Sequence, residues 1–451
     1  MTSLYSPIQL GEFSLRNRVF MAPLTRNRAN PDGTPGPWAE TYYRQRSTAG
    51  LIITEATQIS AMGTGYINTP GIYLPEHIAG WRRIVDGVHD HDGYIFLQLW
   101  HVGRISHTSL LPHGAQPVAP SAVRARSQTV TQLGLMNVSE PRALTLDEIR
   151  DTINDYRTAA ANARAAGFDG IEIHAANGYL IDQFLQSRSN LRTDLYGGSV
   201  SNRIRFLVEI AHAVLEVWDG SRVGIRLSPR GTFNDMGDED PEATFTAAVR
   251  QLATMGLGYL HMVEASPADA PPSPDFRGLF QQFRRKWGGL YVANGGYDGP
   301  RGEEAIKDGR ADAIAYGRAF LANPDLPRRL EHRAPLNEPD QGTFYGGTER
   351  GYVDYPTWER SAALTIRLHV CDVLLTCVGV LDNLLPVDGK PVFPSAVPGC
   401  FVLPPGVGAA SPLVRPMPSP DFSTLGNHGA IAIRIRTVCL IDRAALLGVV
   451  H

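Results

Sequence analysis

A single large (β/α)8 barrel is the fold that this sequence predicts, and two observations carry the prediction. Eight runs of strand length are continuously apolar rather than alternating, as parallel strands buried on both faces require. Helical patterns separate most of these runs, which indicates repeated strand–helix units. The runs cover residues 18–23, 51–56, 94–100, 169–175, 222–229, 258–265, 290–296 and 313–318.

The helix that follows Thr145 has the clearest signals among the predicted helices. Thr145 and Glu148 have the spacing of a capping box, and the apolar residues from Ile149 onward form one helical stripe. Similar periodicity predicts helices over residues 75–88, 200–217 and 241–255. Strands and helices therefore alternate along most of the predicted barrel.

Two further segments are expected to cover the open ends of the barrel. Residues 10–15 look like a small hairpin, which would act as a lid on the N-terminal face. Residues 100–145, after the third strand, form a long connection rich in Ser, Pro, Gly and Gln that is too polar for a core. We expect this insertion to cap the mouth of the barrel, where the strands end.

The composition argues against several classes of partner. Charged residues make up 19% of the chain, hydrophobic residues 43%, and the net charge is -3, so no basic field exists to attract nucleic acid or an anionic membrane. The N-terminus lacks a signal-type pattern, and no run reaches the roughly 18 apolar residues of a membrane helix. We expect a cytoplasmic protein, a monomer or small homo-oligomer, with a small-molecule partner.

Residues 359–451 differ in composition from residues 1–358, which hold all the predicted barrel units. From Ser361 onward Glu, Gln, Trp and Tyr are absent, proline-rich phrases interrupt any period, and all four cysteines occur without metal or iron–sulfur spacing. We therefore predict a barrel domain followed by a poorly structured extension. The extension is either a read-through or late fusion, or a regulatory or oligomerisation module, because residues 370–385 can bury an apolar face.

Three polar side chains leave the end of the fourth strand together. His174 and Asn177 can both donate hydrogen bonds to one oxygen that gains negative charge, and Tyr179 can supply a proton nearby. This combination favours a reaction that polarises and protonates a substrate. The alternative is that His174 is a satisfied core histidine and Tyr179 an ordinary half-buried aromatic residue.

Glycines follow the last two predicted strands. Gly295, Gly296 and Gly317 allow backbone N–H groups to approach an anion, and Arg318 adds a charged fork. Many barrels bind phosphate at this position, so the pattern predicts a phosphate-bearing cofactor. The alternative is that these glycines only turn the chain.

Other strand ends offer hydrogen-bonding, stacking and cationic groups, which suit a ring system with polar edges. These residues are Thr25, Gln98, Trp100 and Arg226. Within an apolar run, Arg226 needs an anionic or electron-rich partner. That partner is either a ligand or a neighbouring carboxylate such as Glu172.

Several longer motifs support a family resemblance that covers roughly residues 3 to 357. They include Asn-Arg-Val-Phe-Met-Ala-Pro-Leu-Thr-Arg (17–26), Glu-Ala-Thr (55–57), Gln-Leu-Trp-His-Val-Gly-Arg (98–104), His-Ala-Ala-Asn-Gly-Tyr-Leu-Ile-Asp-Gln-Phe-Leu (174–185), Arg-Thr-Asp-Leu-Tyr-Gly-Gly-Ser-Val-Ser-Asn-Arg (192–203), Tyr-Gly-Arg (316–318) and Phe-Tyr-Gly-Gly (344–347). With these motifs the chain resembles the Old Yellow Enzyme family of FMN-dependent ene-reductases.

The resemblance implies a role for each candidate residue. His174 and Asn177 would bind the oxygen of an electron-withdrawing group, and Tyr179 would protonate the neighbouring alkene carbon. The flavin ring and ribityl chain would contact Pro23, Leu24, Thr25, Ala56, Gln98 and Arg226. The phosphate would contact Gly295, Gly296, Gly317 and Arg318. The substrate pocket would be lined by Tyr66, Trp100, Phe233 and Tyr345.

The implied activity is reduction of the activated C=C bond of α,β-unsaturated carbonyl or nitro compounds, with NADPH or NADH as hydride donor and no metal. One alternative is a related demethylating or dehydrogenating flavin barrel, but such enzymes usually carry an iron–sulfur motif, which this chain lacks. The other alternative, from a different class, is a catalytically silent FMN-binding or scaffold protein.

Overall fold

A closed parallel barrel forms the centre of the structure, a computed structural model that describes residues 2–264 and 274–359. The eight predicted runs all contain a strand, and the last strand pairs in parallel with the first through Ile314 and Val19, which closes the barrel. The predicted fold class is therefore confirmed. In chain order the barrel strands are β3 (Val19–Met21), β4 (Leu51–Ile53), β6 (Ile95–Trp100), β11 (Gly170–Ala175), β12 (Val223–Leu227), β13 (Tyr259–Val263), β14 (Leu290–Asn294) and β15 (Ala313–Tyr316).

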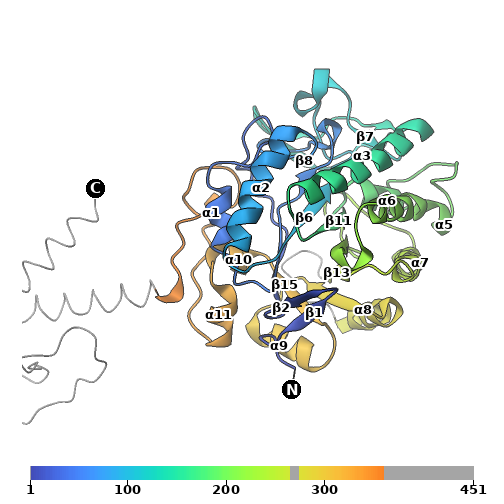
Figure 1. Ribbon diagram of the computed structural model, residues 1–451. Coiled ribbons are helices and arrows are strands. Elements are labelled where there is room, and N and C mark those ends of the chain that lie inside the picture. Colours follow the sequence, from blue (N-terminus) through green and yellow to red (C-terminus); the bar gives the residue numbers. More distant parts are fainter. Residues whose placement is uncertain (1, 265–273, 360–451) are drawn as a thin grey trace, which may run out of the picture. The chain divides into compact units, whose positions relative to one another are not determined.

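Helices follow the strands and pack around the outside of the barrel (Figure 1). The capping box is formed as predicted, because Thr145 Oγ1 accepts from the backbone N–H of Glu148 and Glu148 Oε2 accepts from that of Thr145. The longer helices are α2 (Pro75–His89), α3 (Leu146–Ala165), α6 (Arg205–Leu215), α7 (Pro241–Ala253), α8 (Pro274–Trp287) and α9 (Gly299–Lys307). The short ones are α1 (Ala39–Arg44), α4 (Leu180–Leu185), α5 (Val200–Arg203), α10 (Arg318–Ala322) and α11 (Leu326–Glu331).

The predicted helix over residues 200–217 is divided in the structure. It consists of α5 and α6, with Ile204 between them at φ −78° and ψ −13°. Just before this break, the guanidinium of Arg203 donates to the carbonyl oxygens of Leu185 and Gly198 and to the Thr244 hydroxyl. The backbone at Ile204 stays close to helical, so the correction concerns continuity and not the helix itself.

The N-terminal hairpin is present and plugs the barrel as expected. Strands β1 (Ile8–Leu10) and β2 (Phe13–Leu15) pair antiparallel. Their buried Leu10 and Leu15 side chains pack against residues that project into the barrel from its strands. That cluster also contains Phe20, Ala22, Leu51, Ile53, Phe96, Tyr259, Val292, Ala313 and Ala315.

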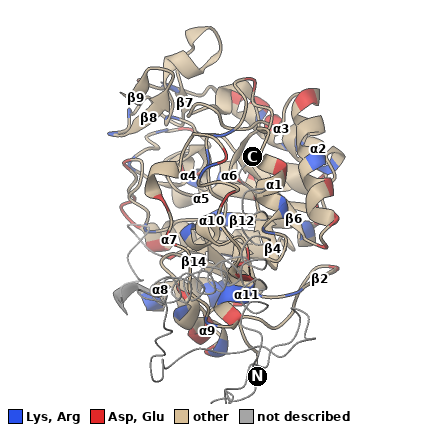
Figure 2. Cartoon of the chain, turned by 90° about the vertical axis from the view of Figure 1, so that its left-hand side faces the viewer, with Lys and Arg blue, Asp and Glu red and all other residues tan. Residues whose placement is uncertain are grey.

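The long insertion lies at the opposite end of the barrel, beyond the end of β6. Figure 2 shows β8 and β9 at one end of the domain and β2 at the other. The elements of the insertion are η2 (Thr108–Leu110), η3 (Pro112–Gly114), β7 (Val118–Ala119), β8 (Gln128–Thr131), β9 (Gly134–Asn137) and β10 (Arg142–Ala143). The remaining short elements are β5 (Thr57–Gln58), η1 (Ala61–Gly63), η4 (Gly220–Arg222) and η5 (Gln341–Thr343).

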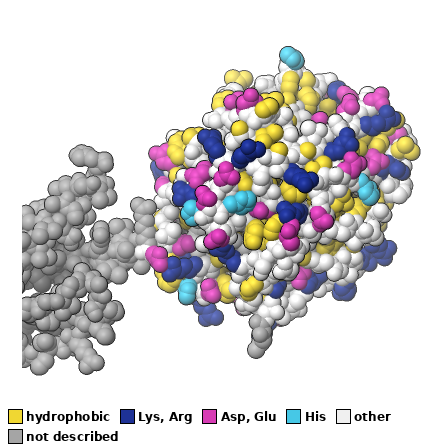
Figure 3. Space-filling model, viewed as in Figure 1, with side chains coloured by type: hydrophobic (Ala, Val, Ile, Leu, Met, Phe, Trp, Pro, Cys, Tyr) yellow, Lys and Arg dark blue, Asp and Glu magenta, His cyan; other side chains and the backbone are white. Residues whose placement is uncertain are grey.

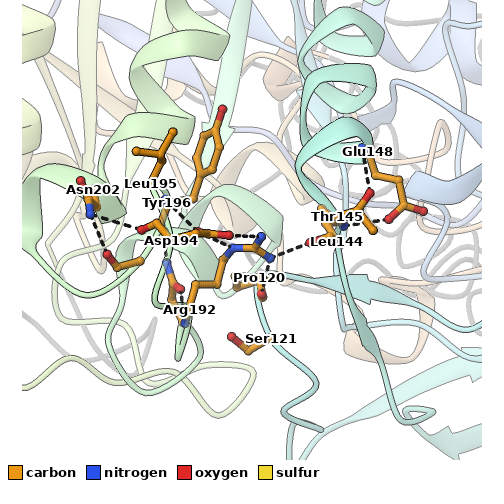
Figure 4. A network of polar contacts seen from close by, with 12 residues as sticks. Pro120, Ser121, Leu144, Thr145, Glu148, Arg192, Asp194, Leu195, Tyr196 and Asn202 are labelled. Carbon is orange, nitrogen blue, oxygen red and sulfur yellow. Dashed lines mark hydrogen bonds and ion pairs between the residues drawn. The ribbon is translucent and has the colours of Figure 1, made fainter.

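Arg192 ties the insertion to the barrel (Figure 4). Its guanidinium donates to the carbonyl oxygens of Pro120 at 2.9 Å and Leu144 at 2.6 Å, and it pairs with Asp194 at 2.6 Å. Because the Arg192 side chain is only 9% exposed, this pair is better protected from water than a surface ion pair. Arg192 thus holds an inner segment of the insertion at Pro120 and its C-terminal end at Leu144.

The surface carries charges of both signs. Figure 3 shows Lys and Arg interspersed with Asp and Glu over one face of the domain. Within residues 2–264 and 274–359, none of the helices combines the length and the apolar character that a membrane-spanning helix requires. The predicted extension, residues 359–451, lies outside the described part of the chain except for Glu359.

Candidate active site

The end of β11 presents the three polar residues singled out from the sequence. His174 lies on the strand and is 3% exposed. The chain then passes through Asn177 at φ 59° and Gly178 at φ 77° before Tyr179 begins α4 as its N-cap residue. Glycine is required at position 178 because a Cβ there would lie 2.7 Å from atoms of Asn234 and Met236.

Four aromatic rings meet at this point. The ring of Tyr179 makes edge-on contacts with His174 at 5.1 Å and with Trp100 at 5.0 Å, measured between ring centroids. Tyr66 stacks on Trp100 at 5.8 Å, and the hydroxyls of Tyr66 and Tyr179 lie 3.3 Å apart. The structure therefore brings a predicted oxygen-binding residue, the predicted proton donor and two predicted pocket residues into one cluster.

Burial sets the protonation states in this cluster. Burial, together with the charges of Arg226 and His261, lowers the pKa of His174 well below its ordinary value, so the imidazole is neutral. Burial and the neighbouring Tyr66 raise the pKa of Tyr179 well above its ordinary value, so its phenol keeps its proton. The neutral imidazole of His174 thus lies beside the protonated phenol of Tyr179.

A layer of buried polar residues crosses the barrel next to His174. Gln98 Nε2 donates to Glu172 Oε1 at 2.7 Å, and the other carboxylate oxygen of Glu172 lies 2.8 Å from His261 Nδ1. Although burial opposes ionisation, His261 and Arg226 hold the pKa of Glu172 below its ordinary value. Glu172 is therefore a carboxylate that balances positive charge inside the barrel.

Arg226 lies in the same layer, and its direct partner differs from the one considered from the sequence. Its Nη2 atom donates to Asn294 Oδ1 at 3.0 Å, whereas the hydrogen bonds of Glu172 go to Gln98 and His261. Glu172 acts on Arg226 only through its charge. Among the described residues, Arg226 Nε has no hydrogen-bond partner, which leaves a buried donor at the mouth.

The two glycine-containing strand ends are neighbours. β14 and β15 pair in parallel through Asn294 and Ala315, so Gly295 and Gly296 lie beside Gly317 and Arg318. The first two glycines have φ values of 124° and 67°, and a Cβ at Gly317 would meet the side chain of Leu24 at 3.4 Å. The exposed Arg318 begins α10. The backbone of the glycine turns and the Arg318 residue thus lie side by side at these two strand ends.

The first two strands end at the same side of the barrel. Pro23, Leu24 and Thr25 follow β3, which pairs with both β4 and β15. Ala56 follows β4 and packs with Trp100 and Tyr179. Pro23 and Ala56 are buried, whereas Leu24 and Thr25 are half-buried. These residues connect the glycine turns with the aromatic cluster.

Two predicted pocket residues lie outside the buried cluster. Phe233, on the loop after β12, is 62% exposed, and Tyr345, after η5, is 69% exposed. Tyr345 nevertheless lies near enough to Tyr66 and Tyr179 to contribute, after burial, to the raised pKa of each. Both residues belong to the rim of the mouth.

Two polar residues of the site were not predicted. Asn234 donates to the carbonyl of Asn177 at 2.9 Å, accepts from Ser127 of the insertion at 3.0 Å, and lies close enough to the hydroxyls of Tyr66 and Tyr179 to oppose the rise in the pKa of each. Asn234 gave no sequence signal, because it lies in a loop. The other residue, His261, interrupts an apolar strand as Arg226 does and could have been recognised in the same way.

The donors at the mouth fit an aromatic ring with polar edges and a phosphate. Three buried nitrogen atoms there lack a partner within the described part of the chain: Arg226 Nε, His174 Nδ1 and Trp100 Nε1. The paired glycine turns and Arg318 supply the donors for an anion. No group of three or more metal-ligating side chains occurs within residues 2–264 and 274–359.

Comparison with known proteins agrees with this geometry. Residues 3–337 match the family model described as "NADH:flavin oxidoreductase / NADH oxidase family". The chain is 46% identical over 359 residues to 12-oxophytodienoate reductase 1 of Oryza sativa subsp. japonica, covering 79% of this chain and 93% of the relative. The solved structure of morphinone reductase superposes with a TM-score of 0.77 at 47% identity, covering 80% of this chain and 97% of that one. Morphinone reductase in complex with tetrahydroNAD gives a TM-score of 0.75 at 48% identity, covering 79% and 98%.

Proposed function

The chain belongs to the NADH:flavin oxidoreductase / NADH oxidase family, the family of Old Yellow Enzyme, and from this premise we propose which of its residues carry the reaction. The protein is an FMN-dependent ene-reductase that uses a reduced nicotinamide to reduce the C=C bond of α,β-unsaturated carbonyl or nitro compounds. When bound, FMN would supply the hydride chemistry that links the reduced nicotinamide to the β-carbon of the alkene. The chain supplies binding, orientation and the proton.

Residues at the mouth are assigned to the cofactor because their donors match it. The residues that would hold the flavin ring and ribityl chain are Pro23, Leu24, Thr25, Ala56, Gln98 and Arg226. The residues that would hold the phosphate are Gly295, Gly296, Gly317 and Arg318. The partnerless Arg226 Nε supports the first assignment, and the adjacent glycine turns support the second.

His174 and Asn177 bind the oxygen of the electron-withdrawing group. Because the pKa of His174 is well below its ordinary value, a neutral imidazole and a neutral amide stabilise the developing negative charge. Fixed dipoles in a buried site act strongly, since little water screens them. We therefore expect the alkene half-reaction to show no step from titration of His174 near neutral pH.

Tyr179 protonates the carbon next to the activating group. Its hydroxyl is attached to a buried ring held between His174 and Trp100, and its raised pKa keeps it protonated. The observation that carries this assignment is the convergence of His174 and Tyr179 at one strand end, with ring centroids 5.1 Å apart. Tyr66, Trp100, Phe233 and Tyr345 line the space for the rest of the substrate.

Several finer properties are part of the proposal. The hydride donor is NADPH or NADH, and the expected location is the cytoplasm. Residues 1–358 are the catalytic domain, acting as a monomer or small homo-oligomer, and residues 359–451 take no part in catalysis.

A steady-state screen tests the proposed function. Enones, nitroalkenes and maleimides are assayed with each nicotinamide, and the flavin absorbance of the purified protein is followed without oxygen. A yellow protein that is bleached by NADPH and recovers its colour on addition of an enone supports the proposal. A yellow protein that is never bleached binds the cofactor without turnover, and a colourless protein that refuses FMN removes the assignment of the site.

A further inference from the structure

Asp182 is a buried carboxyl group to which the reaction proposed above gives no role. It is 0% exposed and lies in the first turn of α4. Its Oδ2 atom accepts from the backbone N–H of Gly178 at 2.8 Å and from the Ser228 hydroxyl at 3.4 Å, and Oδ1 accepts from Gln186 at 2.8 Å. Of these three donors, Gly178 belongs to the turn before α4, and Ser228 contacts that turn through the N–H of Asn177.

The turn held by Asp182 has an unusual backbone. Asn177 and Gly178 both have positive φ, at 59° and 77°, and this conformation is disfavoured for an L-residue such as Asn177. Tyr179 then returns to extended backbone, at φ −90° and ψ −178°. The directions of the Asn177 and Tyr179 side chains therefore depend on interactions that keep this turn in place.

Asp182 supports two successive N–H groups of the turn. It accepts the N–H of Gly178 directly, and it accepts the hydroxyl of Ser228, whose oxygen in turn accepts the N–H of Asn177 at 2.7 Å. Successive N–H groups of a turn form a concave site for an acceptor, and the Asp182 carboxyl group fills it, with burial raising its pKa to about 7. Ser228 follows β12 directly, so the same contacts also join the turn to the neighbouring strand.

The carbonyl groups of the turn are held by neutral amides. Asn234 donates to the Asn177 carbonyl at 2.9 Å, and Gln183 donates to that of Gly178 at 2.7 Å. Asp182 is the acidic member of this set, since the other contacts come from amide and hydroxyl groups. Its removal therefore leaves three buried donors, the Gly178 N–H, the Ser228 hydroxyl and the Gln186 amide, without this acceptor, which costs more than the loss of one neutral hydrogen bond.

A purely structural explanation makes a different prediction. An acidic residue in the first turn of a helix is favourable because it interacts with the partial positive charge at the helix N-terminus. If this were its whole role, replacing Asp182 would lower stability without changing one chemical step relative to another. The two explanations can therefore be separated by kinetics.

We propose that Asp182 is a positioning residue for the reaction, holding Asn177 and Tyr179 in place through the turn at Gly178. The proposal rests on the proposed function, in which Tyr179 protonates the alkene. Only reoxidation of the flavin by the alkene needs that proton, whereas reduction by NADPH does not. Loss of Asp182 must therefore slow reoxidation more than reduction.

The test measures both half-reactions by anaerobic stopped-flow absorbance on the full-length, flavin-loaded enzyme. We expect Asp182→Ala to lower the ratio of reoxidation rate to reduction rate by about 10- to 100-fold, the loss that a misplaced catalytic group produces. We expect Asp182→Asn to keep the ratio, because its amide oxygen can accept from Gly178 while Gln186 turns its own amide. Rates are expressed per bound flavin.

Asp325→Ala serves as the matched control. Asp325 is also a buried carboxyl at the start of a six-residue helix, α11, where it accepts from Arg329 at 2.8 Å and from the N–H of Trp358 at 2.7 Å. Its replacement is expected to lower thermal stability and leave the ratio unchanged. If Asp182→Ala does not fold, Ser228→Ala takes its place, because it removes the acceptor of the Asn177 N–H.

An unchanged ratio in Asp182→Ala, or in Ser228→Ala where that variant replaces it, overturns the proposal. The proposal is also overturned if Asp182→Asn lowers the ratio of reoxidation rate to reduction rate as much as Asp182→Ala does. Failure of the proposed function looks different, since the wild-type enzyme would then not be reoxidised by an enone at all.

Discussion

The hydroxyl oxygens of Tyr66 and Tyr179 lie 3.3 Å apart at the mouth of the barrel. Burial raises the pKa of Tyr66 to about 12 and, together with Tyr66, raises that of Tyr179 well above its ordinary value. Both phenols therefore remain protonated at neutral pH. Of the two, Tyr179 also contacts the ring of His174, which makes it the proton donor in our assignment.

Replacing Tyr179 by Phe should separate the two half-reactions. We expect the variant to keep FMN and to be reduced normally by NADPH, while reoxidation by an enone slows by about 10²- to 10⁴-fold, the usual contribution of a general acid. Nitroalkenes should be less sensitive, because a nitronate can leave and be protonated in solution. Stopped-flow traces check this, with Tyr66→Phe as a control that should slow the enone less. Unchanged reoxidation in Tyr179→Phe would remove Tyr179 from the mechanism.

Replacing His174 by Ala should weaken binding of ligands that place an oxygen at the mouth. Loss of one donor at a well-formed oxyanion site costs on the order of 3 kcal/mol, so the dissociation constant of a phenol should rise strongly while FMN is retained. Because the pKa of His174 is well below its ordinary value, phenol affinity in the wild type should show no His174 step between about pH 6 and pH 8. Phenol is titrated into each protein, and its long-wavelength charge-transfer band with the flavin gives the dissociation constant at each pH. Equal phenol affinity in the wild type and in His174→Ala would refute the role of His174 in binding the oxygen.

Replacing Arg318 by Ala should weaken the hold on the cofactor. Arginine contacts to phosphate are strong when partly desolvated, and Arg318 lies beside the glycine turns at the ends of β14 and β15. We expect the variant to lose FMN on dilution, measured by the return of flavin fluorescence. Arg150→Ala, which removes an exposed arginine paired with Asp147 on α3, is the control. If Arg318→Ala keeps stoichiometric flavin through gel filtration, the phosphate lies elsewhere.

Glu55 should make stability depend on pH. Burial raises its pKa from 4.5 to about 7, against the opposing effects of Arg26 and Tyr43. Since the folded state holds the proton more tightly than the unfolded chain, this contribution is complete below about pH 4.5 and is lost as the pH rises through 7. At about 1.4 kcal/mol per pKa unit, the effect is on the order of 3 kcal/mol.

Urea unfolding at several pH values measures the effect of Glu55. We expect the free energy of unfolding of the wild type to fall, relative to that of Glu55→Gln, between about pH 4.5 and pH 7. A constant difference between the two proteins across that range would show that Glu55 has an ordinary pKa.

Truncation after Trp358 should leave the enzyme intact. The described chain is anchored up to this residue, because the N–H of Trp358 donates to Asp325 at 2.7 Å and Arg329 donates to the carbonyl of Pro356 at 2.8 Å. We expect equal flavin content, turnover and solubility after removal of residues 359–451. Loss of flavin, or a change from a defined oligomer to a monomer by gel filtration, would show that the extension belongs to the working structure.

The fold could be predicted because its signals are local. Continuous apolar runs marked all eight barrel strands, and Thr145 and Glu148 marked a helix start that the structure confirms. The break at Ile204 was missed because the apolar period of residues 200–217 continues across it. Periodicity within one helix does not contain that information.

The candidate site was predictable only in part, for a related reason. Strand ends lie together in any parallel barrel, so the grouping of His174 and Tyr179 with Trp100 followed from their positions. The contacts of Asn234 and the pairing of Glu172 with His261 depend on strand register and on loop paths. The roles assigned to the individual residues stay predictions.

The most direct test of the account is the position of label in the reduced product. Wild-type enzyme reduces an enone with NADPH that carries deuterium at the transferred position of C4, in unlabelled water, and the product is analysed by NMR. We predict deuterium at the carbon β to the carbonyl and hydrogen at the α-carbon, since the hydride passes through the flavin and the proton comes from Tyr179. Deuterium at the α-carbon, or no reduced product, would contradict the central claim.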